Sequence, residues 1–279
     1  MIARRAEEIT PFIVMEVLER ARELERQGVD VIHLEVGEPD FDVPLAVKEA
    51  TRKALDLGLT HYTHSLGDLE LREAICRHYE KTYGVFIKPE QVVVTSGTSP
   101  AMMLVFAALL ERGQEVVLSD PGYSCYPNFI SFLGGVPVRV PVYEKDGFQL
   151  RAEAIRERIG DQTRAILINS PSNPTGNLLS EENMMAIAGL GPYTISDEIY
   201  HGLVYEGRAR SMLEFTDRCI VFNGFSKLFA MTGWRLGYLI VPKELVRTMQ
   251  KMLQNFFISA NAMVQAGGVA ALTDPTVRT

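Results

Sequence analysis

The sequence predicts an α/β protein built on a mostly parallel, seven-stranded sheet that helices cover. Short apolar runs bounded by turn residues recur from residue 91 onward, and helical stretches separate most of them. Strands buried on both faces form such continuous apolar runs, which are typical of parallel sheets between helices. The runs lie at residues 91–96, 115–120, 136–142, 165–170, 193–198, 219–224 and 236–242.

Helical spacing of apolar residues precedes and separates these runs. In residues 11–27 apolar positions recur every three or four residues, and Gly28 follows as a stop signal. Residues 31–36 predict a short strand or an extended segment. Further helices are predicted over residues 43–57, 68–83, 101–112, 151–159 and 243–272, and another between Ser180 and Tyr193.

The composition excludes several classes of protein. Hydrophobic residues make up 47% and charged residues 23% of the 279 positions, which excludes a disordered or fibrous chain. The 28 Lys and Arg against 35 Asp and Glu give a net charge of −7, so we expect no broad basic surface for nucleic acid. The sequence contains no run of about 18 apolar residues, so we expect no membrane span. Charged residues occupy the N-terminus where an export signal needs an apolar stretch.

The cysteines and histidines predict neither a disulfide framework nor a metal centre. Cys76, Cys125 and Cys219 lie far apart and form no C-x-x-C pair, which fits a reducing compartment, and we expect the cytoplasm. Among the five histidines only His61 and His64 have a spacing that suits ligands. They lie in a loop-like stretch where a solvated role is the simpler interpretation, so we expect no metal site.

Polar or aromatic residues follow five of the predicted strands, and ligands bind at this edge of open α/β sheets. The first group, Gly97-Thr98-Ser99, begins a helix whose free N–H groups and dipole suit a phosphate. The alternative is a plain helix N-cap, because Ser and Thr often cap helices. The spacing matches neither of the common nucleotide-binding glycine motifs, so nucleotide binding is not indicated.

Lys227 and Asp197 each follow an apolar strand. Apolar residues flank Lys227, so we expect its amine to be partly desolvated, which lowers its pKa and allows it to form a Schiff base. Asp197 could pair with a cationic ring nitrogen. The alternatives are a surface lysine and a carboxylate that caps the next helix.

Two tyrosines and a turn complete the candidate groups. Tyr123 and Tyr200 could supply a stacking face and a hydroxyl donor, or could be ordinary amphipathic core residues. The stretch Asn173-Pro174-Thr175-Gly176 is a strong turn signal whatever its function.

The ordered combination of these segments resembles the class I and II pyridoxal-phosphate-dependent aminotransferases, in the aspartate aminotransferase superfamily of fold type I. The resemblance implies the large domain of that fold, the cofactor pyridoxal 5′-phosphate (PLP), and transfer of an amino group from an L-amino acid to a 2-oxo acid. The matching stretches extend over essentially the whole chain in family order: VGEPDFDVP (36–44), HYTHSLGDLELREAI (61–75), VVVTSGTSPAM (92–102), SDPGYSCY (119–126), NSPSNPTG (169–176), SDEIYHGLVY (196–205) and NGFSKLFAMTGWRLGY (223–238).

The resemblance also implies roles around the cofactor ring. Lys227 matches the lysine that holds the cofactor as an internal aldimine and then moves the proton between the substrate Cα and cofactor C4′. Asp197 matches the carboxylate that keeps the pyridine nitrogen protonated. Asn173 and Tyr200 match the pair that hydrogen-bonds the 3′ oxygen, and Tyr123 matches the aromatic residue that stacks on the ring.

For the cofactor phosphate, the resemblance implies the helix start after Gly97. Thr98 and Ser99 match the phosphate-binding end of that helix, and Arg235 matches the arginine that pairs with the phosphate. Ser226 is a weaker candidate, because the family often places a hydroxyl near the lysine but not always at that position.

The remaining matches concern the substrate and the partner subunit. Gly37 matches the glycine whose backbone meets the substrate carboxylate, and Asn173 is also expected near the substrate. Tyr62 matches a tyrosine that reaches the phosphate of the neighbouring subunit, which implies an active homodimer.

Two departures from the family pattern concern lengths. The helix between Ser180 and Tyr193 is about one turn shorter than is usual in the family, which we interpret as a shortening at the protein surface. Family members continue further and form most of a small domain, which carries the arginine that grips the substrate carboxylate. No residue after Arg235 matches that arginine, and Arg278 is left unassigned. We therefore expect residues 1–42 to belong to the small domain, residues 43–279 to form the large PLP-binding domain, and the C-terminal portion of the small domain to be absent.

Three hypotheses about activity follow. Transamination is favoured because it is the activity of most members of the family that the sequence resembles. A PLP-dependent lyase, decarboxylase or ring-forming synthase would use the same residues, because the cofactor carries the difficult chemistry. A truncated, non-catalytic PLP-binding fragment is the third, and it follows from the expected absence of part of the small domain.

Overall fold

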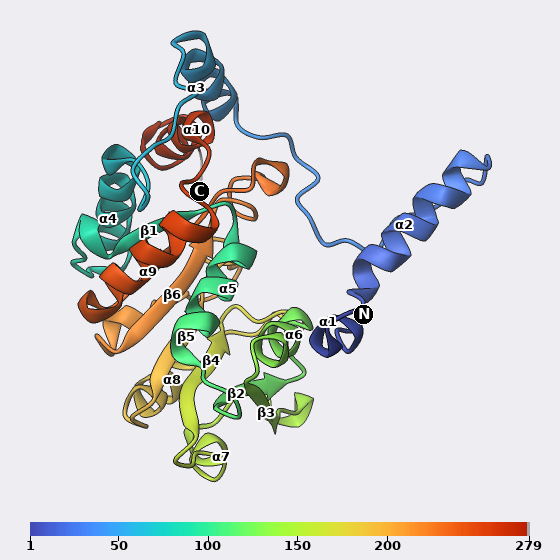
Figure 1. Cartoon of the computed structure of the whole chain (residues 1–279), viewed down its shortest axis with the longest axis vertical. Coiled ribbons are helices and arrows are strands. Elements are labelled where there is room, and N and C mark those ends of the chain that lie inside the picture. The colour runs from blue at the N-terminus through green and yellow to red at the C-terminus, as the bar shows by residue number, and fades with distance from the viewer. Residues whose placement is uncertain (278–279) are drawn as a thin grey trace.

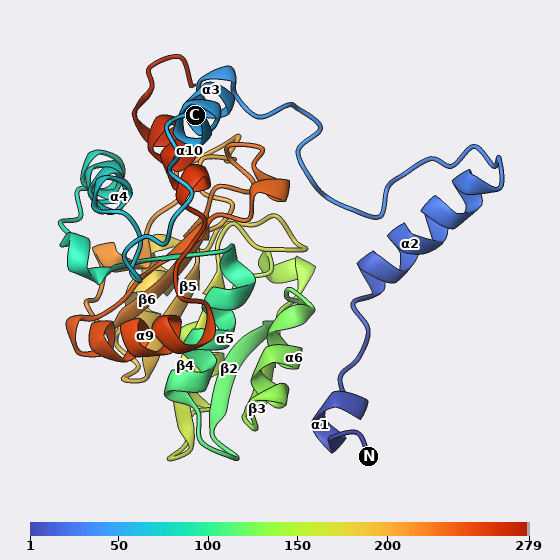
Figure 2. The same ribbon diagram turned by 45° about the horizontal axis from the view of Figure 1, so that its top comes forward.

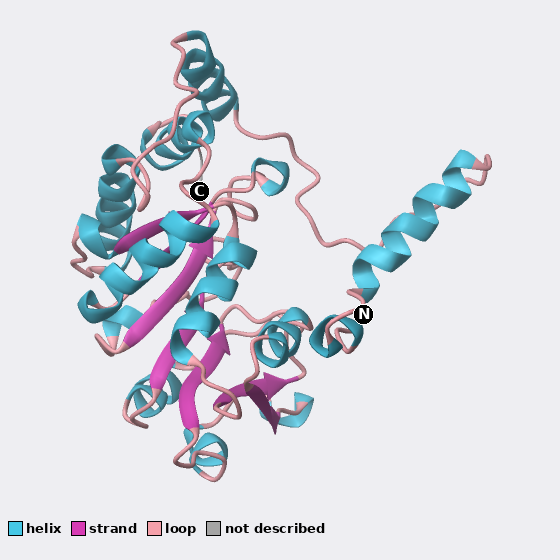
Figure 3. Ribbon diagram, in the orientation of Figure 1, coloured by secondary structure: helices cyan, strands magenta, loops and turns pink. Residues whose placement is uncertain are grey.

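Seven strands form one sheet in the order β1-β7-β6-β5-β4-β2-β3, with helices on both of its faces (Figures 1 and 3). This computed structural model describes residues 1–277, and Arg278 and Thr279 lie outside the described residues. The predicted α/β class and strand number are confirmed. The strands are β1 (Val92–Thr95), β2 (Glu115–Asp120), β3 (Val136–Pro141), β4 (Thr163–Asn169), β5 (Tyr193–Asp197), β6 (Cys219–Gly224) and β7 (Gly237–Ile240).

Most of the sheet is parallel, and β7 is the exception. The pairs β2–β3, β2–β4, β4–β5 and β5–β6 are all parallel. Strand β7 lies between β1 and β6 and pairs antiparallel with both. The residues just before β7 therefore lie at the same edge of the sheet as the residues just after β1 and β6.

Two apolar cores cover the two faces of the sheet. On one face α3, α4, α7, α8 and α10 pack against strand residues such as Val94 and Ile168. On the other face α5, α6 and α9 pack against Val93 and Leu167. Because successive strand residues point to opposite faces, continuous apolar runs supply both cores. The helices are α3 (Leu45–Asp56), α4 (Leu69–Tyr83), α5 (Thr98–Leu109), α6 (Cys125–Phe132), α7 (Ala152–Arg156), α8 (Glu181–Ala188), α9 (Lys243–Phe256) and α10 (Ala262–Thr273). Short 3-10 helices lie at η1 (Pro89–Gln91), η2 (Glu144–Asp146), η3 (Met212–Glu214) and η4 (Thr232–Trp234).

Two expected elements differ from the structure. The single helical stretch predicted over residues 243–272 is two helices, α9 and α10, because Ile258 adopts a left-handed φ of 66° and Asn261 caps a new helix by accepting a hydrogen bond from the N–H of Val264. Residues 31–36, for which a strand or an extended segment was expected, form no strand and run as loop.

The N-terminal segment stands beside the body rather than within it. Helix α2 (Ile13–Arg26) extends away from the sheet, and the short α1 (Arg4–Glu7) lies near α6 (Figures 1 and 2). Ala21 is the one buried residue of α2, which fits an element that packs little against the body. The Oγ1 of Thr10 donates a 2.9 Å hydrogen bond to Oδ1 of Asn128 on α6. None of the helices in residues 1–277 has the length and apolar character that a membrane span needs.

Candidate active site

The strand order brings the predicted site residues to one edge of the sheet. Strands β6, β5, β4 and β2 are successive neighbours, and all four run in the same direction. Lys227, Asn173 and Tyr123 follow β6, β4 and β2, and Asp197 is the last residue of β5. Ligands of open α/β sheets bind at this carboxyl edge.

Lys227 is half-buried and bonded to the N-terminal segment. Its Nζ donates a 3.0 Å hydrogen bond to the carbonyl oxygen of Gly37 and lies 5.9 Å from the centre of the Tyr200 ring. Burial lowers the pKa of Lys227, and the positive charge of Arg235 lowers it further, against an opposing effect of Glu38. The amine is therefore neutral at lower pH than a surface lysine, which agrees with the predicted desolvation, and its role as a nucleophile stays a prediction.

Asp197 is a buried carboxylate with hydrogen-bond donors on two sides. It is 3% exposed, its Oδ2 accepts a 2.6 Å hydrogen bond from the Tyr126 hydroxyl, and its Oδ1 accepts one of 3.1 Å from the N–H of Ile199. Burial raises the pKa of Asp197 to about 6, although both hydrogen bonds act in the opposite direction. A carboxylate that burial penalises in this way gains from a cationic partner.

Tyr126 is a site residue that the sequence did not predict. It lies on α6, and its ring centre is 5.2 Å from that of Tyr123, which precedes the helix. Because Tyr123 lies outside the helix, the spacing of the two tyrosines in the sequence does not indicate that both belong to one site.

Asn173 and Tyr200 form a bonded pair. Asn173 Nδ2 donates a 3.0 Å hydrogen bond to the Tyr200 hydroxyl. Asn169, which the sequence analysis did not single out, accepts from the N–H of Asn173 at 2.7 Å and donates to the carbonyl of Asp197 at 3.0 Å. Its place at the last position of β4 was the available signal. Asn169 thus connects the backbone of the Asn173 turn to the end of β5.

Gly97 and Arg235 lie in direct contact at the start of α5. Gly97 has a left-handed φ of 92° and supplies no side-chain cap to the helix. A Cβ on Gly97 would lie 2.6 Å from Nη2 of Arg235, so a side chain here would displace the guanidinium. Arg235 itself has a φ of 55° and donates from Nη1 to the carbonyl of Thr232 at 2.8 Å. A cation beside uncapped helix N–H groups forms an anion site.

The other predicted site residues differ in how far their side chains are exposed. Thr98 is half-buried and Ser99 is exposed, both in the first turn of α5. Ser226 is half-buried next to Lys227. Tyr62 stands apart on the loop between α3 and α4, with a side chain that is 82% exposed.

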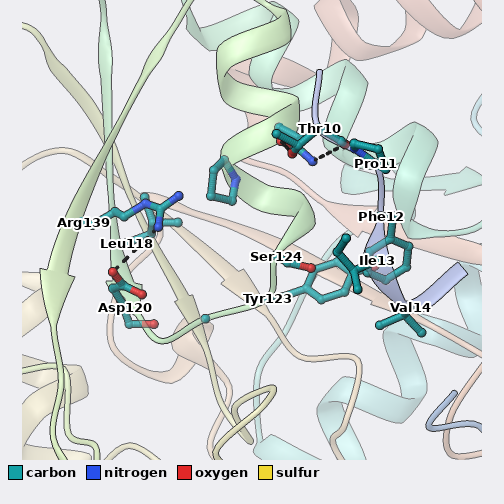
Figure 4. A pocket seen from close by; sticks show the side chains of 14 residues that line it. Thr10, Pro11, Phe12, Ile13, Val14, Leu118, Asp120, Tyr123, Ser124 and Arg139 are labelled. Carbon is teal, nitrogen blue, oxygen red and sulfur yellow. Dashed lines mark hydrogen bonds and ion pairs between the residues drawn. The ribbon is translucent and has the colours of Figure 1, made fainter. Parts of the chain in front are cut away.

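A hollow of about 540 Å³ lies between the N-terminal segment and the end of the sheet at β2 and β3 (Figure 4). Phe12, Ile13 and Val14 lie on the side of Tyr123, and the Asp120–Arg139 pair lies on the opposite side. The edge of the Phe12 ring meets the Tyr123 ring with centres 6.0 Å apart. Within residues 1–277, Tyr123 is the one predicted site residue that lines this hollow.

A buried carboxylate, a desolvated lysine and an anion site at one edge of an α/β sheet fit an enzyme that binds a phosphorylated carbonyl cofactor. The family model described as Aminotransferase class I and II matches residues 29–278. The chain belongs to the class I and II aminotransferases, which use PLP to transfer amino groups. Members of this family are typically homodimers that act on amino acids and 2-oxo acids. The resemblance inferred from the sequence is confirmed.

Named relatives agree on the class and differ in substrate. The chain is 42% identical over 281 residues to a (5-formylfuran-3-yl)methyl phosphate transaminase of Methanocaldococcus jannaschii, covering 100% of this chain and 74% of the relative. It is 39% identical to an aspartate/prephenate aminotransferase of Thermus thermophilus, covering 98% and 72%. A structure of aspartate aminotransferase from Thermus thermophilus with maleate superposes with a TM-score of 0.95 at 39% identity, covering 98% of this chain and 73% of that one.

The residues present fit PLP. The uncapped start of α5, with the guanidinium of Arg235 close to Gly97, suits a phosphate. The buried carboxylate of Asp197 suits a protonated ring nitrogen, and the desolvated amine of Lys227 suits an aldehyde.

Proposed function

We propose that this chain transfers the amino group of an L-amino acid to a 2-oxo acid, with PLP attached covalently through Nζ of Lys227. The main support is the half-buried Lys227 amine, whose pKa burial lowers, at the sheet edge that also holds Asp197. When bound, PLP supplies an electron sink that stabilises negative charge at the substrate Cα. When it is not bonded to the cofactor, the Lys227 amine would be placed to take the proton from that Cα.

The ring nitrogen, the 3′ oxygen and the face of the cofactor ring each have a proposed partner in the protein. Asp197 holds the proton on the ring nitrogen, because an ionised carboxylate in a buried place favours a cation beside it. The Asn173–Tyr200 pair donates hydrogen bonds to the 3′ oxygen, and Tyr123 stacks on the ring face. The 3.0 Å bond between Asn173 and Tyr200 supports their acting together.

The phosphate is assigned to the start of α5. Gly97, Thr98 and Ser99 offer backbone N–H groups and hydroxyls, and Arg235 supplies the charge. Ser226 is a further hydroxyl candidate beside Lys227.

The substrate and a partner subunit complete the proposed site. The backbone of Gly37 and the amide of Asn173 meet the substrate, and the contact of Gly37 with Lys227 supports this. Tyr62 reaches the phosphate of the neighbouring subunit in a homodimer, which fits its 82% exposed side chain.

Residues 1–42 are proposed to belong to a smaller domain, and residues 43–279 to the large domain. The small burial of α2 supports this division. The three cysteines are free thiols, which suits a reducing compartment, and the cytoplasm is the proposed location.

A half-reaction tests the proposed chemistry. The purified protein, loaded with PLP, is mixed with single L-amino acids in the absence of any 2-oxo acid. We expect at least one amino acid to convert the bound cofactor to pyridoxamine phosphate, with one equivalent of 2-oxo acid formed. Release of ammonia or carbon dioxide without pyridoxamine phosphate would instead support a lyase or a decarboxylase.

The attachment residue is tested separately. Borohydride reduction followed by peptide mass spectrometry should locate the cofactor on Lys227. Lys227→Ala should lose the absorption band of the bound cofactor, whereas Lys251→Ala, which removes an exposed lysine from α9, should keep it. A band that persists in Lys227→Ala would disprove the assignment.

A further inference from the structure

A cluster of buried polar side chains lies behind the site, on the segment that also carries two site residues. Asp197 and Tyr200 contact Tyr126, Asn173 and Lys227, as described above. The residues next to them in the chain, Glu198 and His201, are 0% and 5% exposed and have quite different partners. The proposed function gives neither of them a role.

Glu198 receives hydrogen bonds from three separate parts of the fold. Its Oε2 accepts from the Tyr79 hydroxyl of α4 at 3.0 Å. Its Oε1 accepts from the Ser196 hydroxyl at 3.1 Å, the Ser211 hydroxyl at 2.9 Å and the N–H of Met212 at 3.0 Å. Every one of these partners is a donor, which is what an ionised carboxylate requires. Glu198 therefore fixes the start of the 197–201 segment against α4 and η3.

His201 links this segment to the turn that carries Asn173. Its Nε2 lies 2.9 Å from the carbonyl oxygen of Ser170, and since a carbonyl only accepts, Nε2 is the donor. Its Nδ1 lies 2.7 Å from the Tyr83 hydroxyl, which donates to it in the neutral tautomer. Both ring nitrogens are thus occupied inside the protein, one by α4 and one by the end of β4.

The His201–Ser170 bond is a second connection between the segments that carry Tyr200 and Asn173, in addition to the Asn169–Asp197 bond. Tyr200 immediately precedes His201, and Asn173 lies three positions after Ser170. The His201–Ser170 bond and the 3.0 Å bond between Tyr200 and Asn173 therefore join the same two segments. Loss of the first bond would leave Asn169 and the β4–β5 pairing as the other links near the second.

We propose that His201 is a positioning residue, which holds Tyr200 and Asn173 at the spacing needed to bind the 3′ oxygen of the cofactor together. The inference rests on the proposed function, in which these two residues bind that oxygen. Hydrogen bonds to the 3′ oxygen favour its anionic form, so they lower the pH at which the absorption of the bound cofactor changes. This spectroscopic midpoint reports the Asn173–Tyr200 pair directly, and it can be read without turnover.

The test compares midpoints among variants of the PLP-loaded protein. His201→Leu should raise the midpoint by about one pH unit, the size of one weakened hydrogen bond. His201→Gln should restore it, because an amide can donate to Ser170 and accept from Tyr83. Tyr83→Phe, which removes only the donor to Nδ1, should shift it in the same direction by less, and it serves if His201→Leu fails to fold.

Two control variants distinguish a general loss of stability, a wrong role for Tyr200 and a wrong role for His201. His78→Leu alters a ring that packs on Tyr79 and Tyr83, so it should lower the melting temperature and leave the midpoint unchanged. Tyr200→Phe should raise the midpoint, and no change there would contradict the proposed role of Tyr200 itself. If Tyr200→Phe shifts the midpoint while folded His201→Leu or Tyr83→Phe does not, the positioning role of His201 is refuted.

Discussion

The Lys227 amine is bonded to the carbonyl oxygen of Gly37, a residue 190 positions earlier in the chain, at 3.0 Å. This bond joins the segment after β6 to the N-terminal segment, which otherwise packs little against the body. It holds the amine at the sheet edge, half-buried and beside Arg235. Three of the predicted site residues thus influence one another before any cofactor is bound.

The depressed pKa of Lys227 predicts an unusual labelling profile. Burial and Arg235 both disfavour the charged amine, so the amine becomes neutral at lower pH than an exposed lysine does. Competitive labelling of the apoprotein with an acylating reagent, read by mass spectrometry, should give Lys227 a lower pH midpoint than Lys251. Arg235→Gln should move the midpoint of Lys227 upward. Equal midpoints for both lysines would contradict the prediction.

The raised pKa of Asp197 predicts that ionisation of this carboxyl group lowers the stability of the apoprotein. Its pKa is raised from 3.8 to about 6 by burial, so the carboxyl group favours folding when protonated, and this contribution is lost as pH rises from about 4 to 6. Asp197→Asn removes the titration. The free energy of unfolding of Asp197→Asn relative to wild type should increase by about 2 to 3 kcal/mol between pH 4 and pH 7.5.

Urea unfolding of both proteins at the two pH values measures this change. The same variant should bind PLP more weakly, because the ring nitrogen loses its anionic partner. A stability difference that does not vary with pH would show that Asp197 has an ordinary pKa.

The Tyr126 hydroxyl should matter most when Asp197 is ionised. Tyr126→Phe leaves Oδ2 of a buried carboxylate without this donor, which costs about 2 kcal/mol of unfolding free energy at pH 7.5 and less at pH 4. Tyr193→Phe is the matched control, because the Tyr193 hydroxyl donates to Glu244 at 3.0 Å on the surface. We expect that control to cost under about 0.5 kcal/mol. Similar losses in both variants would remove the reason to single out Tyr126.

Gly97→Ala should weaken cofactor binding as well as folding. The new Cβ would meet the guanidinium of Arg235 at 2.6 Å and would be strained at a φ of 92°. Gly113→Ala carries a comparable strain at a φ of 83° but meets no atom within 4 Å. Both variants should lose about 1 to 2 kcal/mol of stability from the backbone strain.

The affinity for PLP distinguishes these two glycines. Spectroscopic titration should show at least a tenfold weaker binding for Gly97→Ala and unchanged binding for Gly113→Ala. An unchanged affinity in Gly97→Ala would argue against the start of α5 as the phosphate site.

The sequence predicted the strands and the residues that follow them, because buried parallel strands and their polar ends leave a clear pattern. It did not predict the direction of β7, since an apolar run such as residues 236–242 reads the same in either direction. That direction brings Arg235 to Gly97. The short helix α6 was also missed, and with it the contact of Tyr126 with Asp197. Such contacts depend on which elements pack together, and local spacing does not encode this.

The place of β7 in the sheet has a consequence for how the protein is made. Strands β1 and β6 never pair with each other, because β7 lies between them. As the chain leaves the ribosome from its N-terminus, β1 cannot be joined to the other five strands by hydrogen bonds until residue 240 has emerged and β7 inserts. Gly97, Lys227 and Arg235 come together only in that step. If the proposed phosphate site at Gly97 and Arg235 is right, we expect full retention of the cofactor to require insertion of β7.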